Sequence, residues 1–384
     1  MNKLYTFFCF IALYSNLAQG QTSTQSLSFA GNNRQYILHV PSIYSQTNAS
    51  VPLVLVLHGL GDNMQNMSNV GFHQIADTAN FIVATPQALP DPNPLIATLG
   101  PAWSSGASMF GITPNATLDD VGFLSALIDS VSAHYNIDRK RIYFTGFSMG
   151  GYMSNRMACE RSDKIAAIAS VAGTIGNSIT CNPQEAVATA HFHGTADAVV
   201  AYSNNSSGMD AEELVEFWQQ HNNCSETPIY TAFPNTNAND GYTVEKYLYP
   251  NGNRNTEVQF VKTIGADHTW LGPNNDIYYT AEIWKFLRKQ EKTLVSSTAP
   301  THTALLQWEA YPNPAQDQLH VKYPPNSPSA HLSLSDMLGN VWQKTEHKAT
   351  DSETVLDISQ LPAGIYLLSL ETEQGRQMKK INKN

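Results

Sequence analysis

The sequence predicts an α/β domain with a doubly wound, mostly parallel sheet, followed by a small all-β, immunoglobulin-like sandwich. Up to about residue 292, continuous aliphatic runs such as 52–57 and 81–86 alternate with helical patterns, as expected where helices connect parallel strands that are buried on both faces. After a Ser/Thr/Pro-rich stretch, short alternating segments such as 319–323 and 364–370 occur without a convincing helix, which is typical of a β-sandwich.

The chain of 384 residues is long enough for two domains. It begins with a predicted secretory signal peptide at 1–20, in which Lys3 supplies a positive charge, an apolar stretch follows to Leu17, and small residues flank Gln19 at a cleavage site. A transmembrane anchor is the alternative, but the apolar stretch is shorter than the roughly 20 residues that span a bilayer. We then assign 21–292 to the α/β domain, 293–308 to a linker and 309–384 to the sandwich.

Within the α/β domain, aliphatic or β-branched runs predict strands, and apolar residues spaced at about 3.6 predict helices. Asp119 and Asp120 begin one helix, where its dipole favours acids, and we interpret both as capping and structural residues. In chain order we expect a hairpin at 26–41, strands at 52–57, 81–86, 141–145, 165–171 and 187–193, helices at 69–79, 119–128, 150–158, 212–221 and 279–291, and a late hairpin joining 242–249 to 257–264.

Composition excludes several classes of partner. Charged residues make up only 14% of the chain and the formal net charge is −10. An acidic chain with no Lys/Arg run outside its extreme C-terminus is not expected to bind nucleic acid. Beyond the signal peptide no segment is long and apolar enough for a membrane span. Because no C-x-x-C spacing is present, we expect no metal held by cysteines, and we expect no cofactor.

Removal of the signal peptide leaves three cysteines, Cys159, Cys181 and Cys224. In an exported protein two of them can pair and leave one free. We predict the pair Cys159–Cys181 because it closes the shortest loop, and three buried thiols are the alternative.

A nucleophile elbow is the most informative motif of the chain. Residues 146–151 read Gly-Phe-Ser-Met-Gly-Gly, a G-x-S-x-G pattern between the β-rich run 141–145 and a helical segment. Such a turn holds its serine, here Ser148, on strained backbone, and it requires small residues at 146 and 150 where neighbouring strands pass close by. The pattern predicts Ser148 as a nucleophile.

A serine is a weak nucleophile until an imidazole takes its proton and a carboxylate orients that imidazole. Among the 12 histidines, His268 combines a place after Ser148 with a loop position after a strand. Asp197 lies between them, which gives the order Ser, Asp, His of α/β-hydrolases. We prefer Asp197 to Asp267 as the acid because adjacent residues usually point apart. His193, beside a glycine at a strand end, is either structural or substrate-facing.

Ester or amide hydrolysis also needs N–H donors for the negative charge that develops on the carbonyl oxygen. Met149 follows the nucleophile and supplies one donor, and Leu60, in an H-G-x-G loop after the first central strand, supplies the other. His58 opens that loop and is either structural or substrate-facing. We take it, with the aromatic residues Trp103 and Trp270, as a candidate substrate-binding residue, and burial in the core is the alternative for both tryptophans.

Five segments of the α/β domain, 57–59, 119–123, 146–151, 193–197 and 268–270, carry a family resemblance that covers about residues 34–290. The domain resembles the secreted polyhydroxybutyrate-depolymerase-like esterases, a group that merges with feruloyl and acetyl-xylan esterases. The resemblance implies an α/β-hydrolase fold and a triad of Ser148, Asp197 and His268. Where relatives often carry more glycine, this chain has 265–267, and it has Leu271 where proline is common, which bears on substrate preference rather than on chemistry.

The tail carries a second set of segments, at 311–315, 334–339, 361–366 and 379–383. With these it resembles the C-terminal sorting domain of type IX secretion substrates in Bacteroidetes-type bacteria. The resemblance implies the type IX secretion machinery as a partner and a secreted product, extracellular or attached to the cell surface. A carbohydrate-binding sandwich is the alternative, for which the aromatic platform would come from Trp342, Tyr323 and Tyr366.

Together these features predict an exported serine carboxylic ester hydrolase that acts through an acyl-enzyme on an ester substrate, which can be polymeric. No insertion long enough for a lipase lid interrupts the catalytic segment, and the extra domain is assigned to sorting. We therefore favour short acyl or aryl esters, such as acetyl or feruloyl groups on polysaccharide, over polyhydroxyalkanoate-type polyester. A serine peptidase and a non-catalytic cell-surface binding protein with the hydrolase fold are the alternatives.

Overall fold

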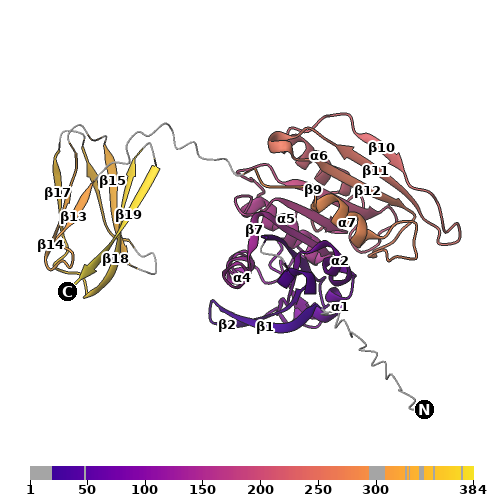
Figure 1. The fold of residues 1–384 in the computed structure, drawn as a ribbon, viewed down its shortest axis with the longest axis horizontal. Coiled ribbons are helices and arrows are strands. Elements are labelled where there is room, and N and C mark those ends of the chain that lie inside the picture. The colour runs from indigo at the N-terminus through magenta and orange to yellow at the C-terminus, as the bar shows by residue number, and fades with distance from the viewer. Residues whose placement is uncertain are drawn as a thin grey trace, which may run out of the picture. The chain divides into compact units, whose positions relative to one another are not determined.

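The computed structural model describes residues 20–46, 49–293, 308–324, 327, 329–336, 341–348, 351–372 and 375–384. The predicted signal peptide, apart from Gly20, and most of the predicted linker lie outside these residues, as do 337–339 of the tail motif. The chain divides between Leu294 and Val295 into two compact units (Figure 1). Each unit is described by itself below.

The first unit is built on one ten-stranded sheet. Its strands are β1 (Gln21–Phe29), β2 (Asn32–Val40), β3 (Val51–Leu57), β4 (Ile82–Pro86), β7 (Ile137–Phe147), β8 (Ala167–Val171), β9 (Ala188–Gly194), β10 (Ile229–Ala232), β11 (Thr243–Tyr249) and β12 (Val258–Ile264). They lie in the order β1-β2-β4-β3-β7-β8-β9-β12-β11-β10, with β1 and β10 at opposite edges (Figure 1). The central strands from β4 to β12 pair in parallel, and antiparallel pairs extend the sheet at both edges.

Helices cover both faces of this sheet, because the central strands are apolar on both. Along β3, Leu53, Leu55 and Leu57 enter one core cluster, while Val54 and Val56 enter the other. The first cluster contains buried residues of α4 (Asp120–His134), α5 (Met149–Glu160) and α6 (Ala211–His221), and the second contains those of α2 (Phe72–Ala79) and α7 (Tyr279–Leu287). This arrangement confirms the predicted doubly wound α/β class.

Several smaller elements were not predicted from the sequence. They are α1 (Met64–Ser68), α3 (Pro94–Ala97), the two-residue strands β5 (Leu89–Pro90) and β6 (Pro101–Ala102), the edge strand β10, and two 3-10 turns, Ser42–Gln46 and Asn253–Asn255. Most are too short to show a periodicity, and β10 is exposed along its whole length, so its sequence has no buried face to reveal. Element ends also differ: α4 runs six residues beyond its predicted end, to His134, and α7 ends at Leu287 instead of 291.

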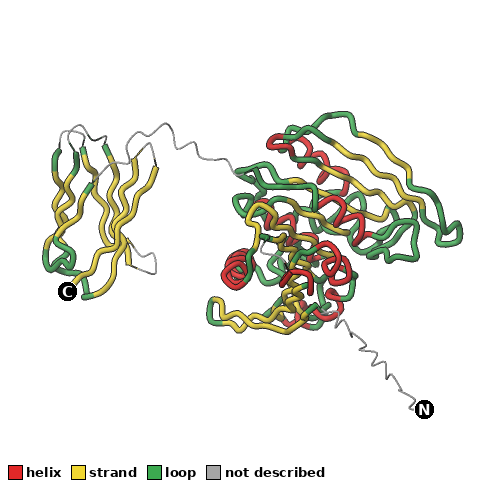
Figure 2. The backbone as a smooth tube through the Cα atoms, viewed as in Figure 1, coloured by secondary structure: helices red, strands yellow, loops and turns green. Residues whose placement is uncertain are grey.

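The second unit consists of strands and loops in the residues that the structure describes (Figure 2). The strands are β13 (Glu309–Tyr311), β14 (Gln318–Lys322), β15 (Ala330–Asp336), β16 (Val341–His347), β17 (Glu353–Asp357), β18 (Gly364–Thr372) and β19 (Gly375–Lys383). They form two antiparallel sheets, β13-β14-β17 and β16-β15-β18-β19, which share one apolar core. The predicted small all-β sandwich is therefore confirmed.

The three aromatic residues considered as a platform for a sugar, Trp342, Tyr323 and Tyr366, are not exposed together. Tyr323 and Tyr366 are both buried in the core of this unit, and Trp342 alone of the three is exposed. In the part of the chain that the structure describes, no helix combines the length and the apolar character needed to cross a bilayer.

A disulfide joins Cys159 at the end of α5 to Cys181 in the loop after β8, as predicted. The remaining cysteine of the described residues, Cys224, is a buried free thiol. Burial raises the pKa of Cys224 to about 11. The thiol is therefore protonated and unreactive at neutral pH.

We predict that opening this disulfide lowers the free energy of unfolding by about 3 kcal/mol, because a closed loop between cysteines 22 residues apart restricts the unfolded chain. Urea unfolding of the double variant Cys159→Ser/Cys181→Ser, compared with the wild type, measures the change. Adding dithiothreitol should lower the midpoint of the wild type and leave that of the double variant unchanged. Equal stability of the two oxidised proteins would contradict the prediction.

Candidate active site

Ser148 lies on a sharp turn between β7 and α5. Its backbone has φ 54° and ψ −120°, a conformation that L-residues rarely adopt. The turn is packed so closely that a Cβ on Gly146 would lie 2.3 Å from the carbonyl oxygen of Gly150, and one on Gly173 the same distance from that of Ser148. Glycine is therefore required at both positions, and the serine is lifted above the carboxyl end of the parallel strands, where it is partly exposed.

The structure brings His268 and Asp197 together beside this turn. Nδ1 of His268 lies 2.8 Å from Oδ2 of Asp197. The imidazole also packs against Phe147, the residue before Ser148, with 4.6 Å between ring centroids. Within the described residues the Ser148 hydroxyl has no hydrogen-bond partner. His268 therefore lies at the turn without being bonded to Ser148, a separation common in catalytic sites without substrate.

Asp197 is held as a carboxylate by several donors. Its side chain is buried, and Oδ1 accepts hydrogen bonds from the N–H groups of Val199 and Val200. Burial alone raises the pKa of this carboxyl, but the bonds from His193, His268 and Val199 outweigh burial and hold the pKa well below its usual range. Asp197 is therefore ionised at any pH at which an imidazole beside it can work.

Asp267, the alternative acid, does not reach the imidazole in this structure. Its Oδ1 accepts hydrogen bonds from the backbone N–H groups of Ala198 and His268, at 3.0 and 2.7 Å. The bond from Ala198 ties the loop after β9 to the loop after β12, and the bond from His268 holds the latter loop in place. Asp267 thereby fixes the backbone on which Asp197 and His268 are carried.

A buried row of polar side chains supports Asp197 from inside the sheet, and the sequence analysis did not identify it. Ser170 Oγ lies 2.8 Å from Nδ1 of His191, and Nε2 of His191 lies 3.0 Å from Nδ1 of His193. Nε2 of His193 in turn lies 2.8 Å from the Val200 carbonyl oxygen and 3.4 Å from Oδ2 of Asp197.

The proton positions along this row follow from its ends. A carbonyl can only accept, so Nε2 of His193 carries a proton and donates to Val200. In the arrangement in which Nε2–H of His191 donates to Nδ1 of His193, the direction of every bond in the row is defined. Nδ1 of His191 then accepts from the Ser170 hydroxyl. Burial, with the neighbouring His193, lowers the pKa of His191 well below its ordinary value, so that the ring is neutral. The available signal in the sequence was the alternation of 191 and 193, which places both rings on one face of β9.

The two predicted oxyanion donors lie on the segments that meet at Ser148. Met149 is the first residue of α5, and Leu60 follows Gly59, whose added Cβ would lie 3.4 Å from the Cβ of Ser148. Among the described residues neither the Leu60 N–H nor the Met149 N–H donates a hydrogen bond. Both N–H groups are therefore free to meet a negative oxygen, and the start of a helix adds a favourable dipole there.

The prediction that His58 and Trp103 line a substrate cleft is wrong, because both side chains are fully buried. His58 Nδ1–H donates to the Gly59 carbonyl at 2.7 Å, and its Nε2 accepts from the Ala88 N–H at 3.0 Å. Trp103 Nε1–H donates to the His58 carbonyl at 2.9 Å, and its own N–H points at Sδ of Met149. Both side chains support the loop around Gly59 and the start of α5 from the core side. The sequence alone does not show whether such a side chain faces a cleft or the core.

Trp270 lies near His268, whereas Asp119 and Asp120 stabilise the start of α4. Trp270 is partly exposed, and its Nε1–H donates to Oγ1 of Thr280 at 2.9 Å, which fixes the ring two residues from His268. Asp120 is buried, pairs with Arg34 at 2.7 Å and accepts from the N–H of Ser104. Asp119 caps α4 by accepting from the N–H of Gly122. The structural reading of the two aspartates is confirmed, and Trp270 remains a candidate substrate contact.

The arrangement joins a partly exposed hydroxyl, an imidazole fixed by an ionised carboxylate, and two free N–H groups. These are the groups needed for nucleophilic attack on a carbonyl with general base assistance and stabilisation of the resulting oxyanion. In the residues that the structure describes, no group of three His, Cys, Asp or Glu side chains is arranged to hold a metal ion.

Two family models match the chain. Residues 38–232 match the phospholipase/carboxylesterase family, and residues 309–384 match the secretion system C-terminal sorting domain. The first match covers the loop of Leu60, the elbow of Ser148 and the loop of Asp197, and the second covers nearly all of the described β-sandwich.

The chain is also similar to individual proteins that are named as esterases. The chain is 28% identical over 262 residues to the bifunctional acetylxylan esterase/xylanase XynS20E of Neocallimastix patriciarum, covering 67% of this chain and 33% of that protein. It is 31% identical over 210 residues to feruloyl esterase B of Piromyces equi, covering 51% of this chain and 37% of that protein. The chain thus spans about a third of the length of these two relatives. A solved ferulic acid esterase from Anaeromyces mucronatus aligns with a TM-score of 0.44 at 17% identity, covering 72% of this chain and 92% of that one.

We predict that the ionised Asp197 makes stability depend on pH in the acid range. Because the folded protein holds the pKa of this carboxyl down, the unfolded chain takes up the proton first as the pH falls. The stabilisation is complete above about pH 4, the ordinary value for aspartate, and is lost as the pH falls from there toward the folded pKa. Asp197→Asn should remove this component at every pH.

The measurement is the urea midpoint between pH 7 and pH 3. The difference between wild type and Asp197→Asn should shrink across this range, whereas Asp317→Asn, at an exposed position of the second unit, should follow the wild type throughout. A constant difference between wild type and Asp197→Asn would show that the pKa of Asp197 is not held down by folding.

Proposed function

The chain belongs to the phospholipase/carboxylesterase family and carries a secretion sorting domain, so it is an exported carboxylic ester hydrolase. We propose that Ser148, His268 and Asp197 catalyse the hydrolysis of its ester substrate through an acyl-enzyme. The observation that supports this most directly is the 2.8 Å contact between Nδ1 of His268 and Asp197 beside the Ser148 turn. Asp197 accepts the Nδ1–H proton, which leaves Nε2 as the basic nitrogen of the ring.

In the proposed reaction, Nε2 of His268 takes the Ser148 proton while Oγ attacks the ester carbonyl carbon. The N–H groups of Leu60 and Met149 stabilise the oxyanion, and the imidazolium then protonates the leaving alcohol. Water, deprotonated by the same imidazole, attacks the acyl-Ser148 ester, and the imidazolium returns the proton to Oγ of Ser148 as the acid is released. Asp197 remains ionised throughout, which its hydrogen bonds favour.

The proposed substrates are short acyl or aryl esters carried by polysaccharide, in first place acetyl and feruloyl groups. The names of the relatives support this class, because they are an acetylxylan esterase and a feruloyl esterase. Trp270 offers a partly exposed, fixed aromatic ring close to His268 against which an aryl group can pack. Polyhydroxyalkanoate-type polyester is the second candidate, supported by the motif resemblance alone.

We predict that Ser148→Ala lowers the rate of ester hydrolysis by about 10³-fold or more, because the nucleophile is lost while binding groups remain. Release of acetate and ferulate from esterified xylan, release of hydroxybutyrate from its polymer, and cleavage of p-nitrophenyl acetate are the measurements. Ser68→Ala, a serine of α1, is the matched control and should keep full activity.

Two outcomes would contradict the proposal in different ways. Ester hydrolysis by a folded Ser148→Ala protein would exclude Ser148 as the nucleophile. Hydroxybutyrate release far above that of acetate and ferulate would retain the mechanism and exclude polysaccharide esters as the preferred substrate. Labelling of the wild type, but not of Ser148→Ala, by a fluorophosphonate probe separates a working hydrolase from an idle binding protein.

We predict that the second unit is needed for export and not for catalysis. The two units are separately compact, so a chain that ends at residue 293 keeps both core clusters of the first unit. In the native host this shortened chain should hydrolyse p-nitrophenyl acetate in cell extracts but be absent from the medium and the cell surface. Its normal appearance outside the cell would contradict a sorting role for 309–384.

A further inference from the structure

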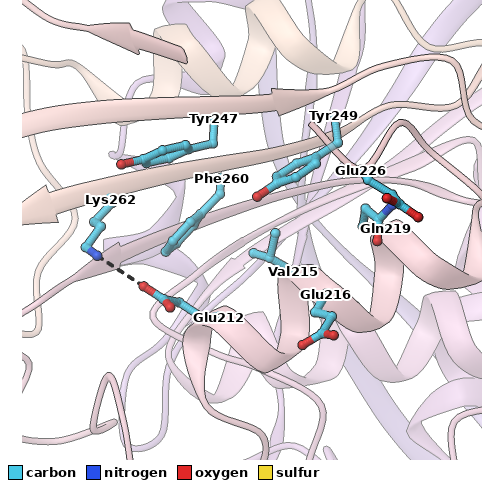
Figure 3. A pocket seen from close by; sticks show the side chains of 9 residues that line it. All are labelled: Glu212, Val215, Glu216, Gln219, Glu226, Tyr247, Tyr249, Phe260 and Lys262. Carbon is cyan, nitrogen blue, oxygen red and sulfur yellow. Dashed lines mark hydrogen bonds and ion pairs between the residues drawn. The ribbon is translucent and has the colours of Figure 1, made fainter. Parts of the chain in front are cut away.

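A groove separate from the Ser148 turn opens between α6 and the antiparallel edge of the sheet (Figure 3). It has a volume of about 460 Å³. Its walls come from Glu212 and Glu216 of α6, Tyr247 and Tyr249 of β11, and Phe260 and Lys262 of β12. We call it the α6–β11 groove.

The period of a β-strand places the aromatic rings of this groove on one face. Tyr247 and Tyr249 are two residues apart on β11, and Tyr247 pairs with Phe260 of β12. The rings of Tyr247 and Phe260 are stacked at 6.3 Å between centroids. Phe260 is buried, whereas both tyrosines are only half-buried. Phe260 therefore forms an apolar floor, and the tyrosines offer ring surface to whatever enters.

Ion pairs and hydrogen bonds fix part of the groove. Glu212 accepts from Nζ of Lys262 at 3.1 Å and from the Tyr202 hydroxyl at 2.6 Å. The Tyr247 hydroxyl donates to Glu245 at 2.8 Å, which holds its ring in place. A rigid aromatic wall loses little conformational entropy when a ligand binds.

Other polar groups of the groove are unused. Within the described residues, the Tyr249 hydroxyl and the Glu226 carboxylate have no hydrogen-bond partner. In Figure 3 the Tyr249 hydroxyl points into the groove, and Glu226 lies at one end beside Gln219. The groove thus holds a donor-acceptor hydroxyl and carboxylate oxygens that a ligand can engage.

These groups select a class of ligand. Three carboxylates against one ammonium disfavour an anion, so phosphates and uronic acids are excluded. Half-exposed tyrosine faces accept the C–H face of a sugar ring, and carboxylate oxygens form charge-assisted hydrogen bonds with its hydroxyls. A neutral sugar chain satisfies both the apolar and the polar walls.

The α6–β11 groove begins close to the residues that contact Asp197 of the candidate active site. Lys262 at one end pairs across the sheet with His193 of β9, and Tyr202, bonded to Glu212, packs against His193 at 5.7 Å. Nε2 of His193 in turn lies 3.4 Å from Oδ2 of Asp197. The groove therefore starts one strand away from the residues that hold the triad acid and continues along β11 toward Tyr249.

We propose that the α6–β11 groove is a carbohydrate subsite that binds the neutral sugar backbone of an esterified polysaccharide while a side-chain ester is at Ser148. This inference rests on the proposed function for the identity of its ligand, xylan. The binding itself needs no hydrolysis, so the two can be tested independently.

The first test is calorimetric titration of the full exported chain with xylohexaose, which carries no ester. Wild type should bind it, and Tyr247→Ala and Tyr249→Ala should each weaken the affinity by about 10-fold or more. Tyr311→Ala, an exposed tyrosine of the second unit, is the matched control and should bind like the wild type. Unchanged hydrolysis of p-nitrophenyl acetate shows that the groove variants remain folded.

The second test compares substrates of different size. On acetylated or feruloylated xylan the groove variants should raise KM by a similar factor with kcat retained, and on p-nitrophenyl acetate they should equal the wild type. If the wild type does not bind xylohexaose, or the variants bind it equally well, the subsite is refuted even where all esters are cleaved. Binding of choline in place of xylohexaose would likewise refute it and assign the groove to cations. Loss of hydrolysis of every ester with intact xylohexaose binding would refute the proposed function alone.

Discussion

The close approach of backbones at Ser148 is the constraint on which the site depends. The turn combines a positive φ at Ser148 with contacts that leave no room for a Cβ on Gly146, Gly150 or Gly173. Backbone strain of this kind costs on the order of 1–3 kcal/mol and persists only where its surroundings enforce it. Here the enforcement comes from β3, β8 and the carboxyl-terminal half of β7, which are buried on both faces. The same approach brings the loop of Gly59 and the start of α5 next to the serine, so the proposed nucleophile and the proposed oxyanion donors, Leu60 and Met149, depend on one packing arrangement.

A second dependence runs through Asp197. A buried carboxylate is costly unless every oxygen has donors, and this one has Val199, Val200, His193 and His268 around it. The row Ser170–His191–His193 supplies part of that support from the interior of the sheet. Burial keeps the His191 ring neutral, so it supports His193 without adding a charge near the carboxylate. The orientation of His268 therefore depends on residues of two strands, β8 and β9, and not on the loop that carries it alone.

The sequence allowed the central strands, both helix layers and the Ser-Asp-His order to be predicted, because these follow from local signals: aliphatic runs, helical periodicity and a glycine-bounded serine. Features that depend on tertiary packing were not predictable. Trp103 and His58 were predicted to line the substrate cleft, yet both are buried in the core, where Trp103 Nε1–H donates to the His58 carbonyl. The row at His191 could not be seen because a polar residue in a strand gives no indication of its cross-strand neighbours. The exposed strand β10 has no buried face and so lacks the pattern that reveals a strand.

The antiparallel extension of the sheet explains where this fold can add a binding surface without an inserted domain. The parallel strands β3, β8 and β9 are buried on both faces, so their side chains are committed to the core. Antiparallel strands tolerate water on one face, and β11 uses this freedom to present half-buried tyrosines beside α6. Because β11 pairs with β12, and β12 leads into the loop of His268, backbone hydrogen bonds fix the proposed groove relative to the loop of the proposed catalytic base. Recognition of a polymer and cleavage of its ester can then be combined in a single sheet.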